Sequence, residues 1–216
     1  MTETVILDLD GTLLEGRERH YQCYRGILEE NGFAPIDIAR YWKSKRERVD
    51  RRRLLALSGA ESLYDLFLAR WLERIEQPEY LAYDALQPGA LLKLDLWRAE
   101  GRRLVLATLR HNPEGLHNQL ERLGLAPQFE HVVVCAHENG GVGKADEVRR
   151  VLTHPDPGPC LWIGDTEIDI AAARSLGCPV WALGCGLRTP EFLSTLQPDY
   201  LSSEFNDVNL RQWNEH

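Results

Sequence analysis

Apolar runs that alternate with helical segments are the feature that most constrains the fold of this chain. The apolar runs lie at residues 4–9, 104–107, 131–135, 160–163 and 179–183. Segments typical of helices lie between these runs, at residues 90–100, 113–123, 144–153 and 167–176. Strands that alternate with helices form βαβ units, so we expect a parallel sheet with helices on both faces. Continuous apolar strands fit burial on both sides of that sheet.

Residues 17–76 follow a different pattern. They are rich in charge, and one helical face collects five apolar residues at helical spacing: Leu63, Leu66, Phe67, Trp71 and Ile75. Asn31-Gly32 is typical of a helix end. We expect three or four helices here and no sheet.

The two patterns together predict one α/β core that a helical insertion interrupts. The expected fold is a three-layer Rossmann-like parallel sheet with an inserted all-helical cap. We expect residues 1–14 and 89–216 to form the core and residues 15–88 to form the cap.

Charge and apolar patterning exclude several classes of protein. The 216 residues carry 25 Lys+Arg against 33 Asp+Glu, a formal net charge of -8, which argues against nucleic-acid binding. No apolar run approaches the roughly 20 residues that cross a bilayer. The acidic start of the chain lacks the basic residues of a secretory signal. We therefore expect a cytoplasmic protein with no membrane partner, either a monomer or a homodimer.

The cysteines give a second indication of the compartment. There are five, widely scattered and with no CxxC pair: Cys23, Cys135, Cys160, Cys178 and Cys185. We expect reduced thiols and no zinc site, because zinc ligands cluster. Cys185 as a redox-active thiol is the alternative.

Polar residues stand where the predicted strands end. In open parallel sheets, ligands bind at the carboxyl ends of strands. The residues at that edge are Asp8 and Asp10 after the first strand, Thr108 after the second, Lys144 after the third, and Asp165 with Asp169 after the fourth. Crowded carboxylates repel one another, and a divalent cation that prefers oxygen ligands, such as Mg²⁺, resolves this.

These groups make up a set suited to phosphoryl transfer. Asp8 and Asp165 could supply carboxylates to Mg²⁺, and the carbonyl of Asp10 a third oxygen. A carboxylate beside the cation can attack phosphorus, while Asp10 moves protons. Thr108 and Lys144 can hold the phosphoryl oxygens.

The motif Asp8-Leu9-Asp10-Gly11-Thr12 resembles the first motif of the haloacid dehalogenase superfamily of phosphatases. Thr108 resembles its second motif and Lys144 its third. The stretch Gly164-Asp165-Thr166-Glu167-Ile168-Asp169 resembles its fourth, in the GDxxxD form. The resemblance covers the whole chain, and the insertion resembles the helical cap of the phosphoglycolate-phosphatase-like subfamily.

The resemblance implies a role for each position. Asp8 would be the nucleophile and a metal ligand, Asp10 the general acid and base and a ligand through its carbonyl, and Asp165 the metal carboxylate. Thr108 would bind the transferring phosphoryl group. Lys144 would neutralise its charge and orient Asp8. Asp169 would act behind the ligands or through a water, and Gly11 and Thr12 would form the turn over the site.

Two positions need separate comment. The family often has Asn after the residue that corresponds to Thr108, whereas here Leu109-Arg110-His111 follows, and Arg110 could be an extra anion contact. True dehalogenases replace the second aspartate and use no metal, so Asp10 argues against dehalogenation.

Plainer interpretations stay open for single residues. Asp8 and Asp10 could form a simple turn, Thr108 could be an ordinary strand residue, and Asp169 a solvated helix residue. Lys144 could be a surface charge, although residues 140–143 predict a flexible glycine loop that lets it swing in.

The basic stretch at residues 43–53 also has more than one interpretation. It could be an exposed helix of the cap, or a lid segment that collects an anionic substrate. Nucleic-acid binding is a weaker third possibility.

The sequence thus predicts an Mg²⁺-dependent phosphatase that hydrolyses a small phosphorylated metabolite through an aspartyl-phosphate. A phosphotransferase such as a sugar phosphomutase is one alternative, because it would share every core residue. A non-catalytic regulatory domain of the same fold is another. The residues do not identify the substrate or say whether the acceptor is water.

Overall fold

The computed structural model describes residues 3–135, 140–152 and 159–213. Its centre is a six-stranded sheet in the order β5-β4-β1-β6-β7-β8, and all neighbouring strands are parallel. The strands are β1 (Thr4–Leu7), β4 (Arg103–Thr108), β5 (His131–Val134), β6 (Cys160–Gly164), β7 (Val180–Leu183) and β8 (Tyr200–Ser202). This confirms the predicted Rossmann-like fold. The sequence pattern did not indicate β8.

Helices cover both faces of the sheet. One face carries α6 (Ala90–Ala99), α7 (Pro113–Arg122) and the C-terminal η4 (Phe205–Asp207) and α11 (Leu210–Trp213). The other carries α8 (Gly140–Val151), α9 (Glu167–Leu176) and α10 (Pro190–Thr195). The short η2 (Ala126–Gln128) follows α7.

Successive strand residues are buried in opposite layers. Leu7 packs in the layer with α6 and α7, whereas Ile6 packs in the layer with α8 and α9. Each such side chain stabilises the fold by roughly 1.5–3 kcal/mol when it leaves water.

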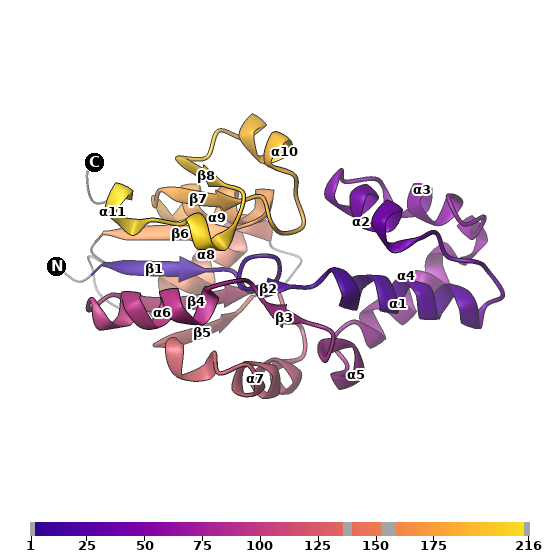
Figure 1. The fold of residues 1–216 in the computed structure, drawn as a ribbon, viewed down its shortest axis with the longest axis horizontal. Helices are drawn as coiled ribbons and strands as arrows, with labels where there is room; N and C mark the ends of the chain where they lie inside the picture. The colour runs from indigo at the N-terminus through magenta and orange to yellow at the C-terminus, as the bar shows by residue number, and fades with distance from the viewer. Residues whose placement is uncertain (1–2, 136–139, 153–158, 214–216) are drawn as a thin grey trace.

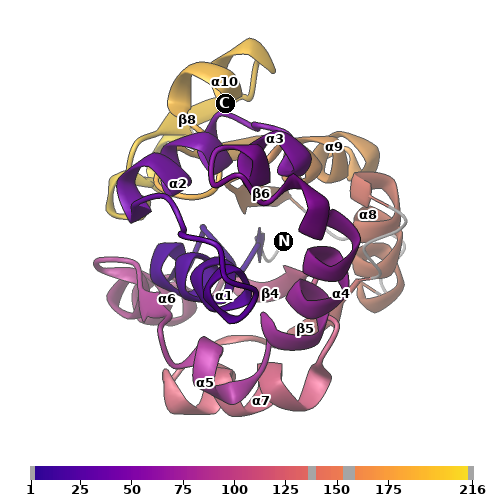
Figure 2. The same cartoon turned by 90° about the vertical axis from the view of Figure 1, so that its right-hand side faces the viewer.

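The helices of the insertion form a second unit with its own core. They are α1 (Arg17–Glu30), α2 (Ile38–Arg46), α3 (Arg51–Ala56), η1 (Glu61–Leu63), α4 (Tyr64–Arg74) and α5 (Pro78–Leu81), and we call them the cap helices. Tyr24, Tyr41, Phe67 and Trp71 pack together at their centre. Figure 1 shows the arrow of β1 pointing toward this unit, and Figure 2 shows the cap helices in front of the sheet.

A short antiparallel ribbon joins the two units. It pairs β2 (Leu14–Glu15) with β3 (Ala85–Leu86), one strand on the way into the cap helices and one on the way out. The sequence did not indicate the ribbon, because two residues are too few for a strand pattern. The division at residues 14/15 and 88/89 stays a prediction.

Two local predictions were wrong. Leu66, expected on the buried face of its helix, is 41% exposed, while Phe67, Trp71 and Ile75 are buried. The expected glycine loop before Lys144 is instead the first turn of α8, which begins at Gly140. Here α8 packs closely on α9, since a Cβ at Gly141 would lie 2.6 Å from the carbonyl oxygen of Ile168.

The basic stretch at residues 43–53 is not one exposed helix. It is split between α2 and α3, because Asp50 begins α3 by accepting hydrogen bonds from the backbone N–H groups of Arg52 and Arg53.

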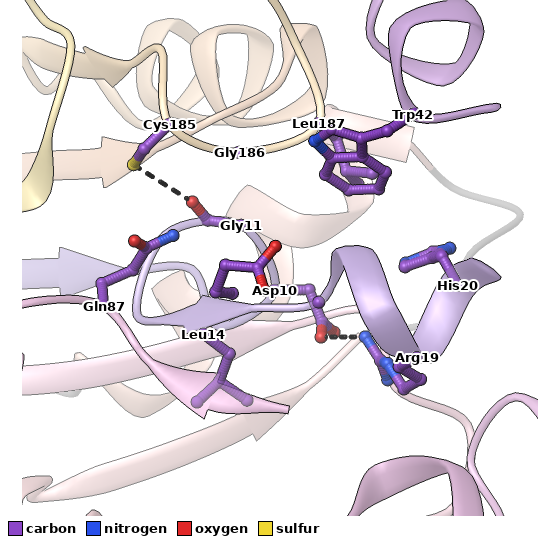
Figure 3. A pocket seen from close by; sticks show the side chains of 12 residues that line it. Asp10, Gly11, Leu14, Arg19, His20, Trp42, Gln87, Cys185, Gly186 and Leu187 are labelled. Atoms are coloured by element: carbon purple, nitrogen blue, oxygen red, sulfur yellow. Dashed lines mark hydrogen bonds and ion pairs between the residues drawn. The ribbon is translucent and has the colours of Figure 1, made fainter. Parts of the chain in front are cut away.

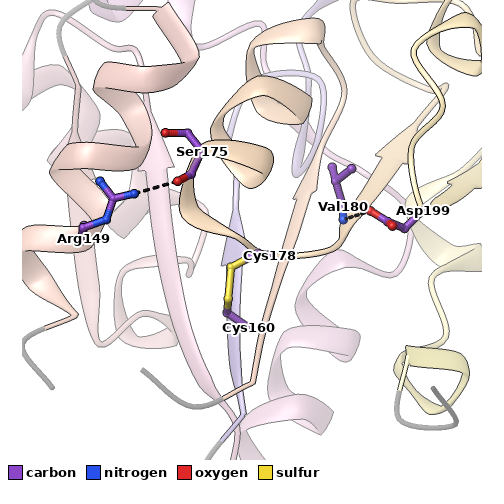
Figure 4. The surroundings of a disulfide bond; sticks show 6 residues. All are labelled: Arg149, Cys160, Ser175, Cys178, Val180 and Asp199. Atoms are coloured by element: carbon purple, nitrogen blue, oxygen red, sulfur yellow. Dashed lines mark hydrogen bonds between the residues drawn. A yellow bond between two sulfur atoms is a disulfide. The ribbon is translucent and has the colours of Figure 1, made fainter. Parts of the chain in front are cut away.

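The expectation of five reduced thiols was also wrong. Cys160, at the start of β6, and Cys178, two residues before β7, form a disulfide (Figure 4). Cys23 and Cys135 are buried free thiols, and Cys185 is a half-buried one. Among the described residues, no helix combines the length and apolar character that crossing a bilayer requires.

Candidate active site

Three buried carboxylates meet at the carboxyl edge of the sheet. Asp8 follows β1, Asp165 follows β6, and Asp169 lies in the first turn of α9. They come together because β1 and β6 are parallel neighbours in which Leu7 pairs with Ile163. One carboxylate oxygen of each residue lies within 4.8 Å of the others. The side chain of Asp10 is not part of this cluster.

Lys144 is the cation that the structure brings to the cluster. Its Nζ donates to Oδ1 of Asp8 at 2.6 Å and to Oδ1 of Asp169 at 2.7 Å. The lysine is 1% exposed, and Asp169 and Asp8 together hold its pKa above the ordinary value although burial opposes the charge. Three carboxylates against one ammonium group leave negative charge that the described side chains do not balance.

The pKa values of the cluster reflect that imbalance. Burial raises the pKa of Asp8 to about 7, against the opposing charge of Lys144, and the charges of Asp169 and Asp10 add to the rise. Burial, with the charges of Asp8 and Asp169, raises the pKa of Asp165 well above its usual range. Buried oxygen ligands that resist ionisation in this way fit a hard divalent cation, which would restore their charged forms.

Two glycines make room for Asp165. Its Oδ2 accepts a hydrogen bond from the backbone N–H of Leu187 at 2.6 Å, and Thr12 Oγ1 donates to Oδ1 at 3.4 Å. A Cβ at either Gly11 or Gly186 would lie 2.1 Å from Oδ2. The sequence pattern did not indicate this role for Gly186.

Asp169 has its oxygens engaged in hydrogen bonds. Besides Lys144, its Oδ1 accepts from Trp162 Nε1 at 3.3 Å, and its Oδ2 accepts from the N–H and the hydroxyl of Thr166 at 3.1 and 2.7 Å. These bonds fix the carboxylate that holds Lys144, so Asp169 acts on Asp8 through the lysine.

Asp10 lies apart from the cluster and contacts two arginines. Arg110 donates to both carboxylate oxygens, at 2.5 and 2.7 Å. Arg19 donates to Oδ1, and Figure 3 shows this contact. Although burial opposes ionisation, Arg110 and Arg19 hold the pKa of Asp10 well below its usual range. In this arrangement Asp10 is a carboxylate.

The same arginines share a second acid, Asp84. Arg19 Nε lies 3.0 Å from Oδ1 of Asp84, and Arg110 Nη2 lies 3.4 Å from Oδ2. All three side chains are buried. Arg110, predicted as an anion contact, thus binds Asp10 and Asp84 here, and Gln119 accepts from it at 3.1 Å.

Sequence reasoning missed Arg19, although a signal was present. Arg19 lies on the buried face of α1 with Cys23, Tyr24 and Ile27, at the spacing of an apolar stripe. A charged residue on such a stripe needs a buried partner.

Glu76 was missed as well. Its carboxylate, between α4 and α5, accepts from the backbone N–H groups of His111 and Asn112, at 3.1 and 2.8 Å. It therefore ties the cap helices to the loop that follows Thr108. Thr108 itself is the buried last residue of β4, which lies beside β1 with Leu106 paired to Leu7.

The cap helices close tightly over Asp10. Between the Asp10 turn, α1 and the loop after β7 there remains a cavity of about 10 Å³, lined by His20, Trp42 and Leu187 among others (Figure 3). That is room for about one water molecule.

Several known proteins are similar to this chain, and they agree with the geometry of the site. The family model described as haloacid dehalogenase-like hydrolase matches residues 2–177. A phosphoglycolate phosphatase of Rhodospirillum rubrum is 30% identical, over 86% of this chain and 81% of its own length. One of Rhodobacter capsulatus is 27% identical over 83% of each chain. The solved structure of a haloacid dehalogenase-like hydrolase from Streptococcus pneumoniae matches with a TM-score of 0.77, at 20% identity and over 98% of each chain.

Proposed function

Since the chain belongs to the haloacid dehalogenase-like hydrolases and is a phosphatase of that family, we propose that it hydrolyses a small phosphate monoester with Asp8 as nucleophile and Mg²⁺ as cofactor. The observation that carries the proposal is the Asp8 carboxylate, held by Lys144 within a buried cluster of uncompensated negative charge.

The residues that would hold Mg²⁺ are Asp8 and Asp165 through their carboxylates and Asp10 through its carbonyl oxygen. The fit rests on their hard oxygen donors and on the raised pKa values of both carboxyls. When bound, the cation would neutralise the cluster and polarise the phosphoryl oxygens.

The chemistry runs in two displacements at phosphorus. A carboxylate oxygen of Asp8 forms a bond to phosphorus while the ester P–O bond breaks, and Asp10 gives its proton to the leaving oxygen. Water then attacks the phosphorus of the aspartyl-phosphate, Asp10 takes the proton of that water, and the Asp8 carboxylate leaves. Lys144 orients Asp8, and Lys144 with Thr108 stabilises the charge on the phosphoryl oxygens.

Asp10 can donate a proton only after its carboxylate leaves the arginines. Two guanidinium groups keep it ionised in the described arrangement. A shift of the cap helices would carry Arg19 on α1 away from Asp10, while Arg110 stays with the core. Asp10 must then also turn from Arg110 and take up a proton from solvent before it gives one to the leaving oxygen.

The proposal also covers the substrate, the acceptor of the phosphoryl group and the cellular compartment. The chemistry fits a small phosphorylated metabolite as the partner and water as the acceptor. We also propose a cytoplasmic location, against which the Cys160–Cys178 disulfide weighs because reducing compartments rarely keep such bonds, and fractionation of cells tests it.

A panel of phosphate esters assayed with Mg²⁺ tests the proposed function. We expect release of inorganic phosphate by the wild type, its loss with chelator, and a loss of at least about 10³-fold in kcat for Asp8→Asn. The matched control is Asp65→Asn, an exposed acid on α4, which should keep wild-type rates. Undiminished turnover by Asp8→Asn would refute the proposal, and transfer to a second sugar in place of phosphate release would indicate a phosphotransferase.

A further inference from the structure

A second cavity, of about 360 Å³, lies between the cap helices and the core. Lys45, Arg48 and Arg51 line it from the cap side, and Arg188 and Glu167 line it from the core side. Lys45 lies in the last turn of α2 and Arg51 begins α3, and Figure 1 shows both helices on the side of the cap nearest α10. The wall of the cavity thus comes from both units, so a bound substrate would contact the cap helices and the core.

The cavity carries a surplus of positive charge. Among the described residues that line it, Glu167 is the single acid. Two arginines share it: Arg188 binds it in two places, at 2.7 and 2.9 Å, and Arg48 Nε lies 3.4 Å away. Within the described part of the chain, Lys45 and Arg51 pair with no carboxylate. Their charged groups lie instead 5.1 and 5.6 Å from the centre of the Trp71 ring.

The positive charges around Lys45 also favour an anion in this cavity. Burial and the charges of Arg51, Arg188 and Arg19 lower the pKa of Lys45 to about 7. A lysine in such company holds its proton more readily when an anion lies beside it.

The cavity adjoins the candidate active site. Glu167 is two residues beyond Asp165, and Leu187, next to Arg188, donates its N–H to Asp165. The end of α2 is held at this rim, because Arg46 donates to the carbonyl oxygens of Gly184 and Arg188. A substrate whose phosphate reaches Asp8 would extend toward these cations.

We propose that this cavity binds a second phosphate group of the substrate, so that the enzyme acts on bisphosphorylated metabolites. The inference rests on the proposed phosphatase function. One carboxylate would bring a single negative charge to a site with a surplus of about three, whereas a phosphate monoester brings about -1.5 to -2 and three acceptor oxygens. The planar guanidinium group of arginine can also donate two hydrogen bonds to one phosphate. The volume of about 360 Å³ far exceeds the space that one water needs and has room for a phosphate and the carbons that carry it.

The experiment compares phosphate esters of simple diols and acids with two to six carbons. For each chain length, the far end carries a hydroxyl, a carboxylate or a second phosphate, and phosphoglycolate is the shortest acid. We expect at least one bisphosphate to exceed the hydroxyl-ended ester of its length by roughly tenfold or more in kcat/KM. The carboxylate-ended ester should gain less.

Substitutions in the cavity test the assignment. Lys45→Met and Arg51→Gln should each reduce the bisphosphate preference by about tenfold. Arg53→Gln, on the same helix but exposed, should leave the preference unchanged. A preference for the carboxylate series, no preference for any bisphosphate, or a preference that neither variant alters would overturn the proposal.

A binding measurement distinguishes failure of this inference from failure of the proposed function. If the wild type hydrolyses no ester, the proposed function fails, and calorimetry of a bisphosphate with wild type and variants still decides the cavity. Weaker binding by Lys45→Met and Arg51→Gln, with Arg53→Gln unchanged, supports it. Equal binding by all four proteins would refute it.

Discussion

Around Asp10, two carboxylates and two guanidinium groups pair with one another. Arg19 and Arg110 each contact both Asp10 and Asp84, so that two cations meet two anions. Removal of one member leaves the others buried without compensation, which is far more costly than removal of an exposed pair.

Arg110→Met should therefore lower the free energy of unfolding by about 3–5 kcal/mol. The control is Arg103→Met, because Arg103 binds Glu130, whose side chain is 47% exposed, and its loss should cost no more than about 1 kcal/mol. Urea unfolding of both variants measures the difference. Similar losses for the two would mean that the Asp10 network is not a stabilising unit.

Gly186→Ala tests the space around Asp165. The added Cβ would lie 2.1 Å from Oδ2, so the carboxylate or the loop must move, at a cost of about 1–3 kcal/mol in stability and a lower kcat. Gly26→Ala in α1 is the control, since its nearest contact would be Tyr80 Oη at 3.4 Å. Unfolding midpoints and Mg²⁺-dependent rates should separate the two variants, and equal behaviour would contradict the packing argument.

The sequence could predict which carboxylates gather, because parallel strands end at one edge and Asp8 and Asp165 directly follow two of them. It could not predict where Asp10 points. That direction depends on Arg19, which reaches Asp10 only after the cap helices pack against the core.

At the scale of elements, strands and helices with long periodic patterns were predictable, and α9 matches its expected bounds, residues 167–176. The misjudged elements are those set by tertiary contact. Gly141 looks like loop sequence, yet it lies in α8, where the close approach of α9 leaves no room for a Cβ. The β2–β3 ribbon has too few residues to carry a pattern.

The disulfide joins two elements and should act on stability alone. Cys160 and Cys178 lie at the amino-terminal starts of β6 and β7, whereas the site lies at the carboxyl ends (Figure 4). Reduction should lower the free energy of unfolding by about 3 kcal/mol and leave the rate of turnover unchanged. The double variant Cys160→Ser/Cys178→Ser should no longer respond to reductant. A wild-type unfolding midpoint that reductant does not alter would contradict this prediction.

For the whole molecule, the formal net charge of -8 is an average over two unlike regions. The core gathers the buried acids Asp8, Asp165 and Asp169, and the cavity beneath the cap helices gathers Lys45, Arg48, Arg51 and Arg188. An overall acidic protein can thus offer a local site for anions beside a site for a cation.

Binding of Mg²⁺ should stabilise the whole fold. A cation that binds the folded chain alone adds about 2.7 kcal/mol at a concentration one hundred times its Kd. We expect thermal unfolding of the wild type to shift upward with Mg²⁺ and that of Asp165→Asn to shift little. An equal shift in both proteins would place the cation elsewhere.

Attack of Asp8 on phosphorus is tested most directly by trapping the aspartyl-phosphate. Enzyme stopped with acid during turnover is reduced with borohydride, digested and examined by mass spectrometry. We predict that residue 8 carries the phosphoryl group before reduction and is converted to homoserine after it, and that Asp8→Asn carries neither change. A phosphoryl group on another residue, or product formation by Asp8→Asn at the wild-type rate, would contradict the account.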